Sequence, residues 1–277
     1  MTADKEPKLP TPPFIILPGI DNLRDIGGYP IAPKGSVRRG FLYRSAHLAS
    51  LTDETATALA KDLGIKTIYD FRSNTENERV PSCDVPGVTR VHIPVFPEKD
   101  ASPEAIALRF QNYSSSESSA GYVRAYSEIL SEGAKKAYRL VFEHIRDRPD
   151  EPLLFHCMGG KDRTGCFSAL CLRLAGVIDD EMIVKEYALT KDGLFRLNQM
   201  FMVMLQQSPA FAENPEGTAK MLSSEPEYMR DTLKYLDETY GSVEGYMRDA
   251  VKFSDEDIEK IKRNLRSEEE PLKFEFL

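Results

Sequence analysis

The chain has 277 residues, of which 41% are hydrophobic and 29% are charged, as in ordinary globular proteins. Its formal net charge of −8 disfavours a general role in binding nucleic acid, so any affinity for phosphate must come from a local positive site. The cysteines form no CxxC pair and the histidines form no metal-binding motif, which disfavours a disulfide framework and a zinc centre.

Residues 1–13 are polar and rich in proline, and they predict a disordered leader before a single domain over residues 14–277. The leader carries acidic residues and lacks a long apolar core, so it does not resemble a signal peptide. The longest apolar runs, such as 201–205, are far too short to cross a bilayer. We therefore expect a cytoplasmic protein without an integral membrane segment.

The first predicted elements alternate between strands and helices. Local patterns predict a strand over 40–45, a helix over 51–63 and strands over 66–71 and 88–95. Thr52 is expected to cap the helix, because its hydroxyl can accept a bond from an N–H group of the first turn.

Most of the second half predicts helix. Apolar residues at helical spacing predict a helix that ends before Pro149: Ala134, Ala137, Tyr138, Val141 and Ile145. Residues 152–156 form a short apolar run, which predicts a buried strand. Further helices are predicted over 163–175, 179–190, 195–206, 225–240 and 254–265, and Ser254 with Asp257 resembles a capping box at the start of the last one.

Strands that alternate with helices predict an α/β fold with a central, mostly parallel sheet flanked by helices and a helical C-terminal third. Within that third, residues 191–226 predict a lid-like helical insertion, and the proline-containing stretch 208–216 is expected to be mobile. A methionine-rich stripe over 200–204 fits core or interface packing better than a cofactor site.

The most specific motif is HCMGGKDRTG at residues 156–165, which lies between a predicted strand and a predicted helix. Two glycines let the backbone bend so that several N–H groups face an anion at the helix N-terminus. Arg163 follows Cys157 by six positions and can hold two phosphate oxygens in a bidentate fork. The expected phosphate-binding residues are Met158, Gly159, Gly160, Lys161, Asp162 and Arg163.

Cys157 is the predicted nucleophile of this loop. A thiol at a helix N-terminus beside basic side chains ionises readily, and a thiolate under a bound phosphorus atom is placed for in-line attack. Thr164 could donate to that thiolate and ease its later departure, and His156 is predicted to be a buried, hydrogen-bonded support. Neither a Walker A motif nor GxGxxG is present, so other glycine-rich phosphate sites are unsupported.

The motif HCxxGKDRTG resembles the signature of protein-tyrosine-phosphatase-type enzymes. Four further stretches resemble the atypical tyrosine/serine phosphatases of bacteria and fungi, over roughly residues 14–265: NLRDIGG at 22–28, LYRS at 42–45, DFRS at 70–73, and LAGV with EYA at 174–177 and 186–188. The resemblance implies a cysteinyl-phosphate intermediate, no metal or other cofactor, and a phosphorylated protein or phosphoinositide as substrate. Lys161 matches a lysine of the phosphoinositide-active branch, whereas Met158 replaces a basic residue of some lipid-active relatives.

The identity of the general acid is left open by the sequence. The chain has no tryptophan, so the WPD loop of many tyrosine phosphatases is absent. Asp162, inside the loop, is slightly favoured; Asp70, which ends a predicted strand and matches the family's DxRS aspartate, is the second candidate, and Asp100 or another loop residue is the third.

Structural roles are the alternative for several of these charged residues. Asp70 could instead form a buried salt bridge with Arg24, Arg44 or Arg72, and this interpretation carries at least equal weight. Arg24 and Asp25 could equally form a structural pair.

Two other functions compete with phosphate-ester hydrolysis. A non-catalytic phosphate-binding module would use the same loop, but intact Cys157, Asp162 and Arg163 argue against it. A rhodanese-type sulfur transferase also uses a cysteine loop, but it does not require arginine at this spacing with Thr164 and Gly165. The sequence therefore predicts a cysteine-dependent phosphatase.

Overall fold

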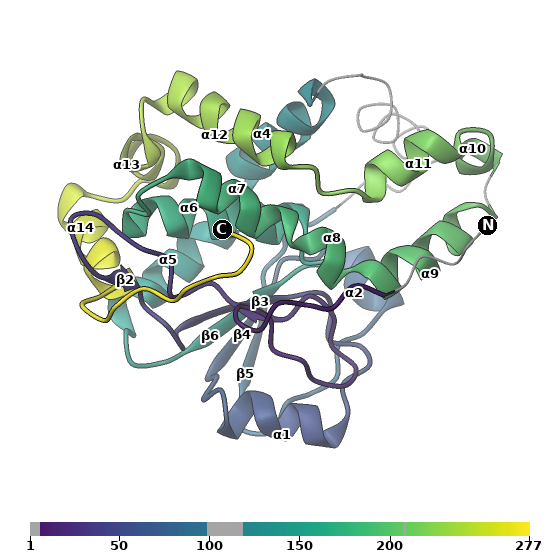
Figure 1. Ribbon diagram of the computed structural model, residues 1–277, viewed down its shortest axis with the longest axis horizontal. Coiled ribbons are helices and arrows are strands. Elements are labelled where there is room, and N and C mark those ends of the chain that lie inside the picture. The colour runs from purple at the N-terminus through teal and green to yellow at the C-terminus, as the bar shows by residue number, and fades with distance from the viewer. Residues whose placement is uncertain (1–5, 99–118, 208) are drawn as a thin grey trace.

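A five-stranded sheet lies at the centre of the protein. The structure, a computed structural model, describes residues 6–98, 119–207 and 209–277 (Figure 1). The strand order is β1-β3-β6-β4-β5, with β1 antiparallel to β3 and the other neighbours parallel. The strands are β1 Arg24–Asp25, β3 Leu42–Ser45, β4 Thr67–Asp70, β5 Thr89–His92 and β6 Leu153–His156. The predicted mostly parallel sheet is confirmed.

Helices cover both faces of this sheet (Figure 1). The side chain of Leu154 on β6 packs into a smaller core with α1 (Asp53–Lys61), whereas its neighbours Leu153 and Phe155 belong to the main core. This alternation follows from the two-residue period of a strand. The main core includes residues of α4 Ala120–Lys135, α5 Ala137–Asp147, α6 Asp162–Ala175, α7 Asp180–Ala188, α12 Pro226–Tyr240 and α14 Asp255–Leu265.

The C-terminal third is mainly helical, as predicted. In addition to α7, α12 and α14, it contains α8 Thr190–Gly193, α9 Phe195–Leu205, α10 Pro209–Ala212, α11 Pro215–Leu222, α13 Val243–Tyr246 and a short π-helix, Met247–Val251. A small second sheet pairs β2 (Ser36–Val37) with β7 (Arg266–Ser267).

Local capping signals were read correctly at two helices. The Thr52 hydroxyl accepts a bond from the N–H group of Thr55 and begins α1, and Gly64 follows that helix with a φ of +66°. Ser254 and Asp257 form a capping box at the start of α14. Such caps depend only on neighbours in the chain, so sequence alone can predict them.

Two local features differ from the expectation. The helix predicted across residues 134–145 is broken at Lys136, where φ is −149° and ψ −54°, so Ala134 ends up in α4 and the other apolar positions in α5. The helix α2 (Asn74–Arg79) was not predicted. Within the stretch 208–216, the described residues include α10 and the start of α11, because proline is favoured in the first turn of a helix. The mobility of this stretch stays a prediction.

The predicted leader is described only in part. Residues 1–5 lie outside the described residues, whereas Pro10 and Pro13 accept backbone bonds from Phe14 and Asp25.

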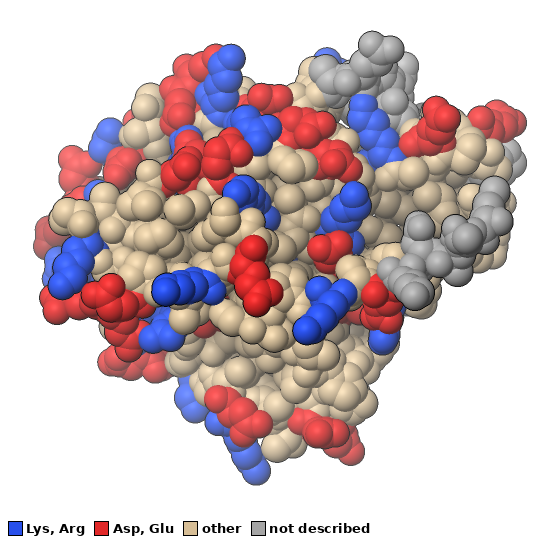
Figure 2. All heavy atoms as spheres, in the orientation of Figure 1, with Lys and Arg blue, Asp and Glu red and all other residues tan. Residues whose placement is uncertain are grey.

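On the face shown in Figure 2, acidic and basic side chains are interspersed, so a positive field for an anion would have to arise locally. No helix in the described part of the chain is long and apolar enough to cross a bilayer.

Candidate active site

The loop 157–161 joins β6 to α6 at the carboxyl edge of the sheet. Both neighbours of β6 run parallel to it, so that Ser45 of β3 and Asp70 of β4 lie level with His156. Gly160 has a φ of +64°, and a Cβ at this position would lie 2.1 Å from the carbonyl oxygen of Ser45. Glycine is therefore required where the loop passes the end of β3.

The peptide groups of this loop are oriented by side chains behind it. The Asn22 amide donates to the carbonyl oxygens of Gly159 and Gly160, at 3.1 and 3.2 Å, and Arg44 Nη2 donates to Gly160 at 2.6 Å. Because the C=O and N–H groups of a trans peptide point in opposite directions, these bonds turn the N–H groups of Gly160 and Lys161 to the inner side of the loop. An anion-binding loop needs this arrangement.

Three buried charges support those contacts. Glu186 of α7 accepts bonds from Arg24 Nε and Arg44 Nη1, both at 2.7 Å, and the three side chains are at most 2% exposed. The stretches NLRDIGG, LYRS and EYA thus meet behind the phosphate loop. The alternative in which Arg24 pairs with Asp25 is wrong, because Asp25 accepts bonds from the backbone N–H groups of Gly27 and Gly40.

We expect Glu186→Gln to lower the free energy of unfolding by about 3 kcal/mol, because two buried guanidinium groups lose their counter-ion. Burial raises the pKa of Glu186, but Arg24 and Arg44 outweigh that effect and hold the pKa below its usual value. The ionised form is therefore stabilised, and this contribution is present above pH 4.5, the ordinary pKa, and is lost as the pH falls further.

Urea unfolding measured across this pH range tests the expectation. Glu181→Gln is the matched control, because Glu181 lies on the same helix but pairs with Arg230 at an exposed site. The control should change the free energy of unfolding by less than about 1 kcal/mol. Equal effects of the two substitutions would contradict the role of Glu186 as the buried counter-ion of Arg24 and Arg44.

Arg163 is held by a carboxylate that the sequence analysis did not identify. Its Nη1 and Nη2 donate to the two carboxylate oxygens of Glu76, at 2.6 and 2.8 Å, and the Arg163 side chain is 8% exposed. Glu76 also accepts the backbone N–H of Ser73 in the capping box of α2. A short helix after β4 therefore fixes the direction of the Arg163 fork.

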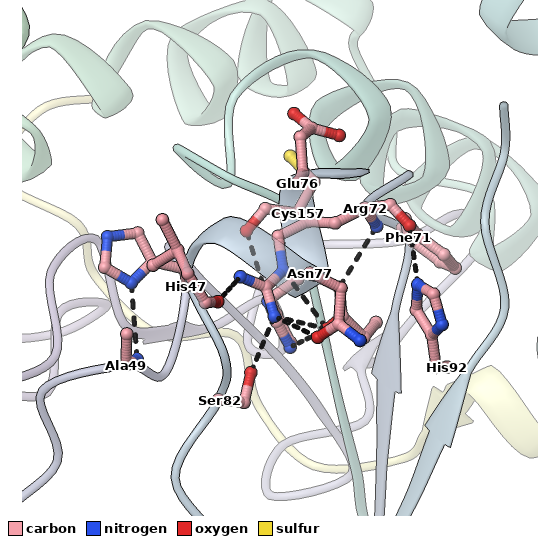
Figure 3. A network of polar contacts seen from close by, with 12 residues as sticks. His47, Ala49, Phe71, Arg72, Glu76, Asn77, Ser82, His92 and Cys157 are labelled. Atoms are coloured by element: carbon pink, nitrogen blue, oxygen red, sulfur yellow. Dashed lines mark hydrogen bonds and ion pairs between the residues drawn. The ribbon is translucent and has the colours of Figure 1, made fainter. Parts of the chain in front are cut away.

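Cys157 lies at the base of this arrangement and is 2% exposed. The charge of Arg163 interacts with both the Cys157 sulfur and the Glu76 carboxylate, and in Figure 3 that carboxylate points to the side on which the sulfur lies. The Thr164 hydroxyl, on the next residue of α6, is buried and has no hydrogen-bond partner among the described residues. His156 is fully buried, with Nδ1 3.1 Å from the Cys157 carbonyl oxygen.

Asp162 and Lys161 form a second polar group on the loop. Lys161 Nζ lies 2.9 Å from Asp162 Oδ1, and the Tyr126 hydroxyl of α4 donates to the same oxygen at 2.8 Å. Lys161 also donates to the carbonyl oxygens of Met221 and Ser223, at 3.3 and 3.0 Å, where α11 ends. Lys161 therefore joins the loop to the segment 191–226.

Asp70 is held differently. Its two oxygens accept Arg72 Nε and Nη2 at 2.9 and 2.7 Å, and both side chains are fully buried. The Arg72 guanidinium also donates to the Asn77 side chain, the Ser82 hydroxyl and the Val80 carbonyl oxygen. Figure 3 shows it beside Asn77 and Ser82. Of the alternative partners considered for Asp70, Arg72 is the one it contacts. Asp100, the third candidate acid, lies outside the described residues.

Sequence reasoning missed Glu76, Glu186 and Asn22. The pattern Ser73-x-x-Glu76 is a capping-box signal that could have predicted α2, although not its contact with Arg163. Within residues 6–98, 119–207 and 209–277, no group of three or more His, Cys, Asp or Glu is placed to hold a metal ion.

The chain is similar in sequence to known phosphatases. Residues 15–267 match the tyrosine phosphatase family. The triple specificity protein phosphatase PtpB of Mycobacterium tuberculosis is 31% identical over 83% of this chain and 91% of its own length. A putative tyrosine-protein phosphatase of Cupriavidus necator is 28% identical over 81% of this chain and 79% of its own. Among solved structures, P. aeruginosa TpbA in complex with pTyr covers 91% of this chain and 98% of its own, at 15% identity and a TM-score of 0.29, too low to support an argument.

Proposed function

This chain belongs to the tyrosine phosphatase family and is a phosphatase, and from that premise we propose that it hydrolyses phosphate monoesters through a phosphocysteine intermediate on Cys157. The observation that carries the proposal is the position of Cys157 at the end of β6, beside the bidentate fork of Arg163 and the unpartnered hydroxyl of Thr164. The loop amides and Arg163 bind the phosphoryl oxygens, as helix N-termini and arginine forks do elsewhere.

The reaction then has two steps. The Cys157 sulfur forms a bond to phosphorus while the bond from phosphorus to the ester oxygen breaks, and a general acid gives its proton to that oxygen. Water next attacks the phosphocysteine and returns a proton to the same carboxylate, and the sulfur–phosphorus bond breaks. Thr164 can donate to the departing thiolate, because its hydroxyl has no other acceptor among the described residues.

Asp162 is the general acid that the geometry supports better. Its side chain is 29% exposed, whereas that of Asp70 is fully buried and engages Arg72 with both oxygens. Burial raises the pKa of Asp162, but Lys161, Tyr126 and Arg163 outweigh it and hold the pKa below its usual value. A phosphate dianion bound in the loop adds negative charge beside Asp162 and raises this pKa again, so the carboxyl group can carry a proton in the complex.

We expect Asp162→Asn to lower kcat for phenyl phosphate by on the order of 100-fold and to lower kcat for p-nitrophenyl phosphate much less. The nitrophenolate departs without a proton, whereas the more basic phenolate needs one. Initial rates with both substrates, measured across pH, provide the test. An equal loss for both substrates would assign Asp162 to binding and not to proton transfer.

For the substrate, we propose phosphotyrosine first, with phosphoserine, phosphothreonine and phosphoinositides as further candidates. The relative named a triple specificity phosphatase supports this breadth. Lys161 could meet a second phosphate, although its ammonium group is engaged with Asp162 and with carbonyl groups at the end of α11. Turnover of phosphotyrosine peptides, phosphoserine peptides and phosphoinositides by the purified protein in EDTA tests the proposal. Absence of phosphate release from every substrate, with tight phosphopeptide binding, would favour a non-catalytic module.

We further propose that residues 14–277 act as one cytoplasmic phosphatase domain in which residues 191–226 form a lid. The support is contact with the phosphate loop at two points. A Cβ added to Gly159 would lie 3.3 Å from Leu194 Cδ1, and Lys161 binds the end of α11. A substrate that draws Lys161 toward its own phosphate would weaken the second contact.

A further inference from the structure

The two oxygens of the Asp162 carboxylate differ in their hydrogen-bond partners. Tyr126 donates to Oδ1 at 2.8 Å, and Lys161 Nζ lies 2.9 Å from the same atom. Among the described residues, no group donates to Oδ2. One oxygen is therefore anchored from α4 and from the loop, and the other is left to exchange a proton.

Tyr126 belongs to the main hydrophobic core, so its position is set independently of the loop. It is fully buried on α4, and its hydroxyl lies 2.6 Å from that of Tyr187 on α7. A hydroxyl has one proton, and Tyr126 gives its proton to Asp162, so Tyr187 is the donor in the second bond. The result is a directed chain from Tyr187 to Tyr126 to Asp162.

The Tyr126 hydroxyl stays protonated at neutral pH. Burial, together with the negative charge of Asp162 and the other tyrosines, raises the pKa of Tyr126 well above its usual value. Tyr126 is therefore a permanent donor and does not compete with Asp162 as a proton source for the substrate.

We propose that Tyr126 is a positioning residue for proton transfer: its hydroxyl anchors Oδ1 of Asp162 so that Oδ2 carries the proton and delivers it to the leaving group. The inference rests on the proposed role of Asp162 as general acid. When the proton leaves, the new carboxylate keeps the hydrogen bond from Tyr126, and this bond is stronger to the charged form than to the neutral form.

Other ionisable groups also face Asp162, and Tyr126→Phe leaves all of them in place. They are Lys161 and Arg163 beside it in the chain, Cys166 further along α6, Tyr122 on α4 and Tyr187 on α7. Loss of the Tyr126 hydroxyl removes a donor that favours ionised Asp162, so the carboxyl group would keep its proton to higher pH.

The test is the pH profile of kcat for phenyl phosphate with Tyr126→Phe, because kcat reports ionisations in the complex with bound substrate. The limb that falls as the pH rises should move upward by about one pH unit, since a hydrogen bond to a charged group is of this size. At the same time kcat for phenyl phosphate should fall on the order of 10-fold, with little change for p-nitrophenyl phosphate.

Tyr246→Phe is the matched control. Tyr246 is also fully buried, but its hydroxyl donates to the Leu130 carbonyl oxygen of α4 at 2.8 Å and not to Asp162. This substitution also removes a buried tyrosine hydroxyl that contacts α4, so a purely structural effect should appear in both variants. The falling limb should stay in place in this control.

The outcomes separate the inference from the proposed function. A falling limb that is absent in Asp162→Asn but unmoved in Tyr126→Phe would overturn the inference and leave the acid in place. A limb that Asp162→Asn does not affect would instead reject Asp162 as the acid. If Tyr126→Phe does not fold, Tyr187→Phe decides, because it weakens the same chain: a smaller upward shift supports the inference, and an unmoved limb overturns it.

Discussion

Cys157→Ser is expected to lower kcat/KM for p-nitrophenyl phosphate by on the order of 10⁴-fold or more while the protein keeps its fold. Serine matches cysteine in shape, and the Cys157 side chain lies buried at the end of β6. The serine hydroxyl, however, does not ionise at neutral pH and cannot form the phosphocysteine intermediate. Initial rates in EDTA, together with acid-quenched labelling of the wild type by ³²P-phosphotyrosine peptide, measure both consequences.

Cys83→Ser is the control for this substitution. Cys83 is a free, half-buried cysteine that follows α2 and whose N–H group bonds to the Leu48 carbonyl oxygen. The same chemical change there should leave turnover and labelling unchanged. Full activity of Cys157→Ser, or label that stays bound to the protein in that variant, would reject the phosphocysteine pathway.

Arg163→Lys is expected to lower kcat/KM by about 10²–10⁴-fold, because lysine keeps the charge but not the planar fork. In the resting structure this fork binds both oxygens of Glu76, at 2.6 and 2.8 Å. A phosphate that enters the loop therefore meets a guanidinium whose direction is already set, and little ordering remains to be done on binding. A lysine side chain would lack that direction.

Arg173→Lys is the matched control on the same helix. Arg173 pairs with Asp180 and Asp237 on the outer side of α6, and its loss of fork geometry should not affect turnover. Thermal unfolding of both variants separates catalysis from folding, because Arg163→Lys keeps a positive charge beside Glu76 and should stay folded. An Arg163→Lys enzyme within about tenfold of the wild type would show that the fork has no special role.

The features that the sequence predicted well depend on near neighbours in the chain. Thr52 and Ser254 cap their helices with hydroxyl groups three residues from their partners, and the apolar runs at β4 and β6 give strands. The break at Lys136 was missed, because both flanking segments share one apolar periodicity and only packing separates α4 from α5. Pairing Arg24 with Asp25 failed for a related reason: adjacency in sequence does not bring side chains on opposite faces of a strand together.

The sequence by itself determined that a cysteine, two glycines and an arginine share one turn between a strand and a helix, because their spacing is a local property. Only the tertiary structure decided which carboxylates would serve that turn. Glu76 lies 87 residues from Arg163, and Glu186 lies 162 and 142 residues from Arg24 and Arg44. Tyr126 contacts Asp162 from another helix. Such partners are selected when parallel strands place their ends at one edge and burial requires every charge to find a counter-charge, and no local pattern encodes that choice.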